Sequence, residues 1–571
     1  MSQLIEDLCR AVDAGAMMRH LAVFAEREKL SGSSEERESF HYLAKVLTEL
    51  GWRTELIGHD AYISLPGKAR LFVGGTRLDC ITQSFSQPSG PAGLRAPVVY
   101  AGSGGSRDLT GLDVAGRIVL LDGIANPAAS LRASQAGALG QIHVSPLEHL
   151  YEMCISPVWG SPTEAQRDLL PRTVVVTIRH EDGDALKRRI IAGEMLEAEI
   201  FAEVETGWRE TPILQADLDA PNAPDDTFVL FSGHHDTWYR GVMDNGSANA
   251  TMLEVARLFA PRRDALVRGL RLCFWSGHSH GRYSGSAWYA DERFGELEAR
   301  CVAHVNVDSV GAKGNTVLTD ALSSHELFRV AAEAVERQGG QTLIGHRMSR
   351  AGDQSFWGIG IPSLFMAMGE QPASKGPSVM GPAIGGAATR NGAGFGWWWH
   401  TPDDTLDKID PDLLVRDARI YVHAIGRLLT DPLLPLDVAR QVTALEKALV
   451  GLESDLAGRL DLSALLSALR GLAEVARRIQ VAGSPETSCS NAALIDACRA
   501  LVPLDYTRGD RFEPDPALKQ DPYPVLDPIR ALAATEPGTD ASRFARVAAR
   551  RALNRIAAAL ETARIALADP S

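Results

Sequence analysis

The sequence predicts an α/β fold, in which a mixed sheet with flanking helices carries an inserted β-rich domain and a C-terminal helical domain. Three observations predict it. Short apolar runs of strand length alternate with stretches whose apolar residues recur at helical spacing. Between residues 66 and 212 the pattern changes to short strands, and after residue 435 the chain becomes helical and rich in Ala and Leu. We therefore expect a main domain at 1–65 and 213–435, an insert domain at 66–212 and a helical domain at 436–571.

The expected elements follow in chain order. The main domain begins with helices around residues 16–28 and 35–50, followed by a strand at Arg53–Ile57. The insert has strand patterns at Pro97–Tyr100, Arg117–Leu121 and Val174–Ile178. The main domain then resumes with apolar, strand-like runs at Thr227–Phe231, Arg271–Trp275 and Ala303–Asp308. In the last domain we expect helices within 439–459, 462–478, 492–501 and 541–566, with a connector rich in Pro and Asp at roughly 503–528.

Composition and charge narrow the class of protein. The chain has 571 residues, which exceeds a single core, and 58 basic against 72 acidic residues give a net charge of −14. Without a long Lys/Arg run, this balance predicts no nucleic-acid partner and no anionic membrane surface. Residues 1–10 are typical of an acidic amphipathic helix rather than of a signal peptide, and no run approaches the ~20 apolar residues of a membrane span. Seven cysteines without metal-ligand spacing indicate reduced thiols, so we expect a cytoplasmic protein.

The most informative segment is Ser232–Ser247, because it gathers potential metal ligands on one loop. His234, Asp236 and Asp244 lie between the apolar run Thr227–Phe231 and a stretch of helical spacing that begins near Ala248. Loops at the carboxyl ends of strands in α/β sheets are where ligands bind. A lone histidine in a loop is usually only solvated, but three potential ligands within eleven residues favour half of a two-metal hydrolase site.

Two later segments supply partners for such a site. Asp308 ends a predicted strand, and His400 lies on a loop after an aromatic run. The order His-x-Asp, Asp-Asn-Gly, Asn-x-Asp-Ser and His-Thr-x-x-Asp-Thr resembles the co-catalytic zinc aminopeptidase family, which includes glutamate carboxypeptidase II and the transferrin receptor. The resemblance covers roughly residues 18–435 and implies a zinc-exopeptidase-like sheet.

The resemblance also implies a role for each matching residue. His234, Asp244 and Asp308 would bind one metal, and Asp244 would bridge to a second metal that His400 also holds. Asp236 would orient His234. Imidazole and carboxylate together suit zinc, and one or two Zn²⁺ ions are expected, although another divalent transition metal also fits this ligand set.

The chain departs from the family where the family carries a Glu-Glu pair, the general base and a ligand of the second metal. Here the segment after Trp275 contains His278, Ser279 and His280. Alignment forward from Trp275 places His278 on the base and Ser279 on the ligand, whereas alignment back from Gly285 places Ser279 on the base and His280 on the ligand. Because imidazole suits both proton transfer and zinc binding, we predict that His278 transfers the proton and that His280 binds the second metal.

Several residues near these motifs are candidates for substrate recognition, and the arginines among them could bind a carboxylate. They are Arg240, Arg282, Tyr283, Arg350 and Trp399. For Arg350 the alternative is a structural ion pair with Asp353. The Gly-rich stretch 381–396 predicts an irregular cover over the site.

The other two domains also carry resemblances. Gly116–Asp122 and the Ala-Gly-Ala-x-Gly turn at residues 136–140 resemble the protease-associated domain of the same family, which implies that the insert shapes or covers the cleft. A purely structural insert is the alternative. The helical domain resembles the one that dimerises in the transferrin receptor relatives, and this resemblance implies a homodimer; an intramolecular bundle is the alternative.

The sequence therefore predicts a metal-dependent hydrolase that cleaves an amide bond in a peptide or a small acylated amino compound through metal-activated water. It is aminopeptidase-like. A non-catalytic binding protein on the same scaffold and a non-peptide amidohydrolase are the alternatives.

Overall fold

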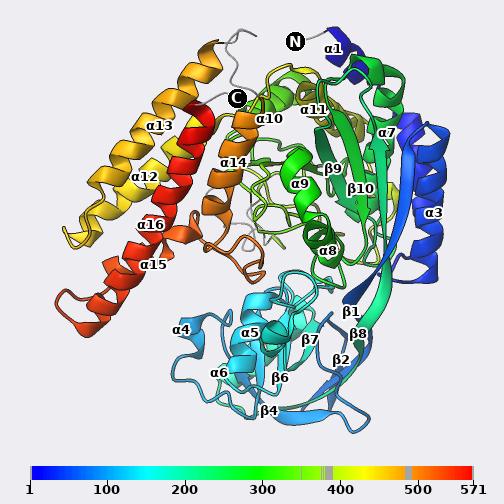
Figure 1. The fold of residues 1–571 in the computed structure, drawn as a ribbon. Helices are drawn as coiled ribbons and strands as arrows, with labels where there is room; N and C mark the ends of the chain where they lie inside the picture. Colours follow the sequence, from blue (N-terminus) through cyan, green and yellow to red (C-terminus); the bar gives the residue numbers. More distant parts are fainter. Residues whose placement is uncertain are drawn as a thin grey trace.

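The computed structural model describes residues 3–348, 350–374, 376, 378–379, 390–482 and 491–568. Within these residues the strands join into one 14-stranded sheet in the order β13-β12-β14-β11-β9-β10-β8-β4-β5-β6-β7-β3; β1 pairs with β8, and β2 pairs with β1. The predicted α/β class with a mixed sheet and flanking helices is confirmed, and Figure 1 shows the insert domain below the main domain and the last helices beside it.

The centre of the main sheet consists of buried parallel strands. β9 (Phe228–His234) lies between β10 (Gly269–Trp275) and β11 (Cys301–Asn306), and both pair with it in parallel. Every residue of β9 and β11 is buried, which explains their near-continuous apolar runs. The far edge is completed by β12 (Leu322–Ser323), β13 (His346–Arg347) and β14 (Ser363–Leu364).

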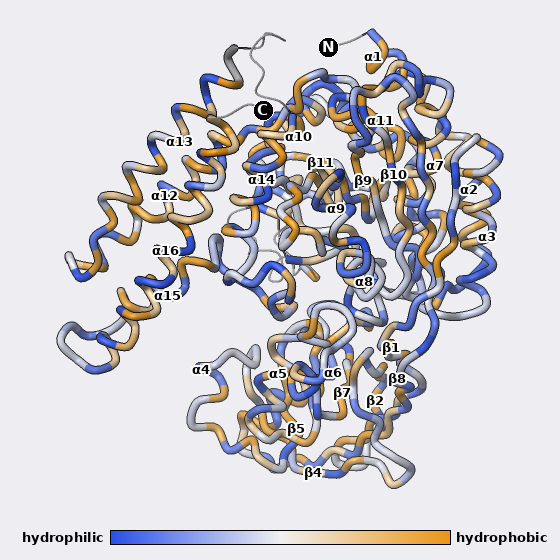
Figure 2. The backbone as a smooth tube through the Cα atoms, in the orientation of Figure 1, coloured by the Kyte–Doolittle hydropathy of each residue, from blue (hydrophilic) through white to orange (hydrophobic). Residues whose placement is uncertain are grey.

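Helices cover both faces of this sheet. One side carries α1 (Gln3–Arg10), α2 (Ala14–Phe24), α3 (Ser34–Glu49), α7 (Ala248–Phe259), α10 (Phe328–Ala334) and α11 (Pro411–Thr430), which contact one another or β1, β8 and β9. The other carries α8 (Ser284–Glu292) and α9 (Phe294–Arg300). Figure 2 shows hydrophobic segments along the central strands, whose two faces are both covered.

Two long strands connect the main domain to the insert. β1 (Arg53–Val73) pairs antiparallel with β8 (Glu197–Leu218) along nearly its whole length, with a register shift between Pro66 and Ala69. The predicted boundaries at 65/66 and 212/213 therefore lie inside continuous strands.

The insert domain is a smaller α/β unit with its own core. Its strands are β2 (Thr76–Leu78), β3 (Cys80–Thr82), β4 (Leu94–Tyr100), β5 (Ile118–Asp122), β6 (Gly140–Val144) and β7 (Val174–Ile178). The run from β4 to β7 is parallel, and α4 (Ser106–Leu109), α5 (Pro127–Gln135) and α6 (His180–Ile191) accompany it. The insert therefore contains three helices beside its strands, whereas the sequence predicted a β-rich domain.

The last domain is helical, as predicted. It contains α12 (Val438–Leu456), α13 (Ser463–Ala482), α14 (Asn491–Tyr506), α15 (Asp527–Ala533) and α16 (Asp540–Ala568). The Arg499 guanidinium on α14 donates to carbonyls of the main domain, including Glu298 at 2.9 Å and Gly360 at 3.0 Å. No helix in the described ranges combines the length and apolar composition needed to cross a membrane.

Candidate metal centre

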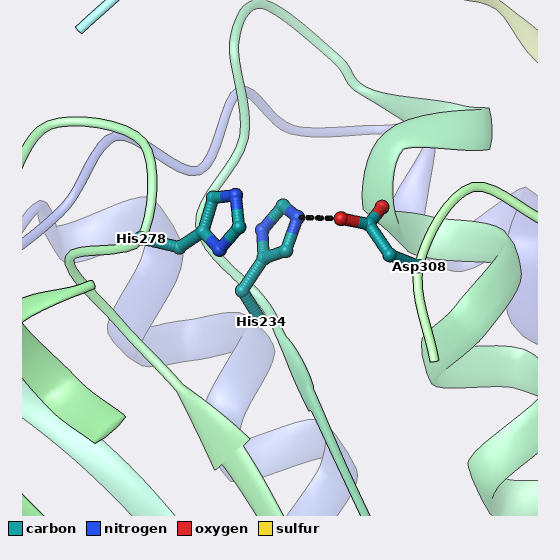
Figure 3. Close-up of side chains that lie close together, drawn as sticks. All are labelled: His234, His278 and Asp308. Atoms are coloured by element: carbon teal, nitrogen blue, oxygen red, sulfur yellow. Dashed lines mark ion pairs between the residues drawn. The ribbon is translucent and has the colours of Figure 1, made fainter. Parts of the chain in front are cut away.

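The carboxyl ends of the three central parallel strands bring the first site residues together. His234 is the last residue of β9, His278 follows the end of β10, and Asp308 follows the end of β11. Their ligand atoms all lie within 4.8 Å of one another. Figure 3 shows the imidazoles of His234 and His278 side by side, with the Asp308 carboxylate directed at His234.

Asp244 reaches the same point from the irregular turn that precedes α7. The turn Val242–Ser247 begins after Gly241, whose φ is 50° and where a Cβ atom would lie 2.2 Å from the Asp244 carbonyl oxygen. Only glycine fits there without displacing the turn. His234 Nε2 lies 3.1 Å from Asp244 Oδ1 and 3.6 Å from Asp308 Oδ2.

His400 faces the other oxygen of the same carboxylate. His400 Nε2 lies 3.1 Å from Asp244 Oδ2, so the two oxygens of Asp244 each face a different imidazole. His400 has a φ of 59°, a left-handed backbone that is uncommon outside glycine and concentrates at functional sites. A carboxylate held between two imidazoles is the arrangement expected of a residue that bridges two metal ions.

These separations are compatible with ligands that share a zinc ion. Two ligand atoms about 2.1 Å from a tetrahedral zinc ion lie about 3.4 Å apart. The three measured separations, 3.1, 3.6 and 3.1 Å, are close to that value. In addition, His234 Nε2 and Asp244 Oδ1 are buried atoms without a hydrogen-bond partner, which a metal ion between them would satisfy.

The predicted histidines share one anchoring pattern, in which Nδ1 is engaged by protein and Nε2 is left for another partner. His234 Nδ1 donates to the Asp236 carbonyl at 2.8 Å, and His400 Nδ1 donates to the Glu152 carbonyl at 2.6 Å. His278 Nδ1 lies 2.9 Å from Asp353 Oδ2. Because a carbonyl or carboxylate only accepts, each of these rings carries its proton on Nδ1.

The charges around His234 are strongly coupled. Burial alone would lower the pKa of His234, but the Asp308 and Asp244 carboxylates raise it well above its usual value. Burial would raise the pKa of Asp244, yet its electrostatic interactions with the facing imidazoles of His234 and His400 hold that pKa well below its usual range. When no metal ion is bound, the His234 imidazole therefore holds a proton that faces the Asp244 and Asp308 carboxylates.

Asp236 holds the site together differently from the prediction. Its backbone carbonyl, not its carboxylate, accepts the Nδ1 proton of His234, while the nearest carboxylate oxygen is 3.7 Å from Nδ1. The carboxylate instead accepts from the backbone N–H groups of His278 at 3.2 Å and Ser279 at 2.9 Å. Asp236 thereby fixes the loop that carries His278 and His280.

His280 is neutral and keeps one buried nitrogen without a partner. The hydroxyl of Ser31 donates to Asp236 Oδ2 at 2.7 Å, so it accepts from His280 Nδ1 at 2.9 Å. Burial lowers the pKa of His280, and its Nε2 has no hydrogen-bond partner. The Trp238 ring lies 4.4 Å from His280 and 5.3 Å from His400. The buried Ser279 Oγ is also without a partner.

Two of the predicted substrate arginines are engaged elsewhere. Arg240 is exposed and donates to the Ala25 carbonyl at 2.9 Å. Arg350 donates to the carbonyls of Asp515, at 2.7 Å, and Pro516, and its partner is not Asp353. Burial lowers the pKa of Arg350 to about 10. Both guanidiniums therefore make structural contacts with backbone carbonyls.

The remaining predicted residues adjoin the site. The Tyr283 ring lies 4.9 Å from that of His278, and Arg282 extends over Tyr283. The Trp399 ring stacks on His400 at 3.5 Å. His278, Asp308 and His400 are the least buried site residues, with side chains 15%, 16% and 10% exposed, so the site opens on their side. Most of the predicted cover at 381–396, and Ser349 beside Arg350, lie outside the described residues.

Sequence reasoning missed the residues beneath the site. Lys29 is fully buried, its amine donates to carbonyls including those of Phe24 and Arg240, and burial lowers its pKa to about 8. The Asp404 carboxylate accepts from the backbone N–H groups of Met243 at 2.8 Å and Asp244 at 2.9 Å, and burial raises its pKa to about 7. The His-Thr-x-x-Asp order around residue 404 was the one signal that could have marked it.

Comparisons with known proteins find similarity to peptidases. Residues 215–425 match the sequence profile of peptidase family M28. A probable glutamate carboxypeptidase of Arabidopsis thaliana is 23% identical over 49% of this chain, and the match spans 42% of the plant protein. The aminopeptidase YwaD of Bacillus subtilis is 22% identical over 73% of this chain and 84% of its own length.

Solved structures show the same fold. The aminopeptidase from Aneurinibacillus sp. strain AM-1 has a TM-score of 0.56 at 22% identity, over 74% of this chain and 96% of its own. A peptidase M28 precursor from Shewanella amazonensis has a TM-score of 0.57 at 17% identity, over 75% and 95%.

Proposed function

We propose that the chain, whose residues 215–425 match the profile of peptidase family M28, is a metal-dependent hydrolase of amide bonds in peptides or small acylated amino compounds. The observation that carries the proposal is the single carboxylate of Asp244, whose two oxygens each face the free Nε2 of a different imidazole. Zinc is the metal that this set of nitrogen and oxygen ligands favours.

The proposed centre has two unequal positions. His234, Asp244 and Asp308 would hold the first metal, and Asp244 and His400 the second, with His280 as its third ligand. Support for His280 is its neutral ring and its buried, unpartnered Nε2. Only two carboxylates would then offset two divalent ions, which favours an anionic or strongly coordinating substrate group.

A bound metal would polarise the scissile carbonyl and acidify a water molecule. The proton would pass to His278, whose Nδ1 proton points at Asp353 and whose Nε2 is left to accept. Asp353 also accepts from Ser286 at 3.0 Å, so its carboxylate is fixed on two sides. The closeness of His278 to His234 and Asp308 favours a second role, as a further ligand of the first metal.

The experiment that tests this function is metal analysis combined with activity. Purified protein is assayed for zinc by elemental mass spectrometry and for hydrolysis of peptides and acyl amino acids, before and after chelation. We expect bound zinc and turnover that chelation abolishes and zinc restores. Protein that binds no transition metal and hydrolyses nothing after reconstitution would instead be a binding protein on the peptidase scaffold.

Within this class we propose an aminopeptidase-like exopeptidase. Its support is the match to bacterial aminopeptidases over most of their length, at low identity. A panel that pairs each free-amine peptide with its N-acetylated form tests whether cleavage requires a free N-terminal amine. Faster cleavage of the acetylated forms would exclude an aminopeptidase and favour the amidohydrolase alternative.

We further propose that the helical domain forms a homodimer. Phe544, Val547 and Ile565 on α16 are 78%, 54% and 54% exposed, and a cavity of about 500 Å³ lies between α13 and α16. Sedimentation should give a dimer mass that Phe544→Glu reduces to the monomer mass. A monomeric wild-type protein would refute the homodimer and favour the alternative, an intramolecular helical bundle.

Two proposals concern the insert and the compartment. We propose that the insert is a protease-associated domain beside the cleft, which is supported by its parallel core and by the contacts of residues 149–161 with the site. We also propose a cytoplasmic location, because all six cysteines among the described residues are free thiols. Fractionation with thiol labelling of the native protein tests the location.

A further inference from the structure

One segment of the insert domain reaches the second metal position directly. Glu152 and His400 exchange two hydrogen bonds: His400 Nδ1 donates to the Glu152 carbonyl at 2.6 Å, and the Glu152 N–H donates to the His400 carbonyl at 3.2 Å. The group that sets the ring orientation and tautomer of His400 is therefore a backbone carbonyl from the other domain.

This pairing is held in place from both sides. The buried Gln83 side chain donates to the Tyr151 carbonyl at 3.1 Å and accepts from the Met153 N–H at 2.5 Å, which fixes the peptide on either side of Glu152. Toward the main domain, the Tyr151 hydroxyl donates to the Trp397 carbonyl at 3.0 Å, and the His149 ring stacks on Trp397 at 4.3 Å.

The same segment continues to the loop that carries His278 and His280. Gly160 N–H donates to the Arg282 carbonyl at 2.7 Å, and the Trp159 ring lies 4.6 Å from Tyr283. Residues 149–161 therefore contact both sides of the centre.

The covalent connection between the main domain and the insert consists of the two strands β1 and β8. β8 pairs with β10 at Ile213–Leu218 and with β4 at Glu197–Ile200. Between these stretches, among the described strands, only β1 pairs with it, and the register shift at Pro66 lies there. A two-stranded ribbon is marginal on its own, so the contacts of residues 149–161 help to set the position of the insert.

We propose that docking of the insert domain and occupancy of the His400 metal position are thermodynamically coupled through the Glu152–His400 pairing. The proposal rests on the metal centre proposed above. When the insert is docked, the Glu152 carbonyl keeps His400 Nε2 directed at Asp244. By linkage, a metal that binds better to this docked arrangement must stabilise the docking to the same extent.

Hydrogen exchange tests the coupling in one direction. Zinc-loaded and chelated wild-type protein are compared by mass spectrometry on peptides that cover residues 149–156, with β5 (Ile118–Asp122) as the internal reference from the core of the same domain. We expect chelation to speed exchange in 149–156 and to leave β5 unchanged. Equal rates in 149–156 with and without zinc would overturn the proposal.

Titration of zinc tests the other direction. Tyr151→Phe removes only the hydroxyl that holds the segment to Trp397, and Tyr100→Phe is the matched control in the same domain, where the hydroxyl bonds Asp122. Loss of a group that orients a metal ligand costs about 10–100-fold in affinity. We expect Tyr151→Phe to weaken the affinity for the second zinc ion by up to that factor. The affinity for the first zinc ion should be unchanged, which also shows that the variant is correctly folded. Affinities equal to those of Tyr100→Phe would refute the coupling.

The metal centre and the coupling can be refuted separately. Wild-type protein that binds no zinc would refute the metal centre itself. Protein that binds two zinc ions, but whose second affinity and segment exchange do not respond to each other, would refute only the coupling.

Discussion

Asp236→Asn is the substitution that most severely tests the arrangement beneath the site. The buried carboxylate accepts three hydrogen bonds, from the Ser31 hydroxyl at 2.7 Å and from the N–H groups of Ser279 at 2.9 Å and His278 at 3.2 Å. An asparagine has one oxygen and one NH₂ group in the same volume. At least one of the three donors must then face another donor.

The magnitude follows from these bonds. Losing one charge-assisted bond costs about 1.5–3 kcal/mol, and leaving a buried N–H without a partner costs about 1–3 kcal/mol more. Burial would raise the pKa of Asp236, but its interactions with the nearby histidines, His280 first, hold the pKa well below its usual value. The charged form is thus favoured in the folded protein, so its removal brings no relief. We expect the free energy of unfolding to fall by the sum of these costs, roughly 2.5–6 kcal/mol.

The assay is urea unfolding of the metal-free protein, with Asp540→Asn as the control, because Asp540 is 81% exposed. The control should stay within about 0.5 kcal/mol of wild type. Since the folded pKa of Asp236 is depressed, its contribution is present above the unfolded value of about 3.9 and is lost as the pH falls below it. An Asp236→Asn protein as stable as the control at pH 7 would refute this reasoning.

Other predictions concern the chemistry. Asp353→Asn should leave bound zinc unchanged but lower turnover by about 10²-fold or more, because His278 loses the acceptor that fixes its tautomer; unchanged turnover would exclude that role. His278→Ala should abolish turnover and keep both metals, whereas loss of the first metal would identify His278 as a ligand. His280→Ala should lower bound zinc from two equivalents to one, and an unchanged zinc content rejects it as a ligand. Saturating zinc, at about 1,000 times its Kd, should stabilise the folded protein by about 4 kcal/mol over the chelated form, and an unchanged unfolding midpoint would contradict a folded-state metal site.

Where a functional side chain follows a buried strand, the sequence was sufficient to predict its place. β9 and β11 are short apolar runs, and His234 and Asp308 come at or just after their carboxyl ends. Because both strands are parallel neighbours, their ends meet, and the residues meet with them. The helices of the last domain were equally accessible, since their apolar residues recur over several turns.

Contacts between distant segments could not be predicted in this way. Ser31 contacts Asp236 across 205 residues of sequence, and the Glu152 carbonyl contacts His400 across 248. Such contacts depend on one hydroxyl or one backbone group, which leave no periodic pattern. The length of β1 was also missed, because its stretch Leu65–Arg70 is exposed or half-buried and contains Pro66 and Gly67, which are typical of a loop.

The central claim is that Asp244 bridges two metal positions. It is tested most directly by anomalous diffraction at the zinc edge from a crystal of the zinc-loaded protein. The account predicts two peaks, one within about 2.2 Å of His234 Nε2 and an Asp244 oxygen, the other within the same distance of His400 Nε2 and the second Asp244 oxygen. A crystal that holds zinc only away from Asp244, or holds none at this carboxylate under saturating zinc, would contradict it.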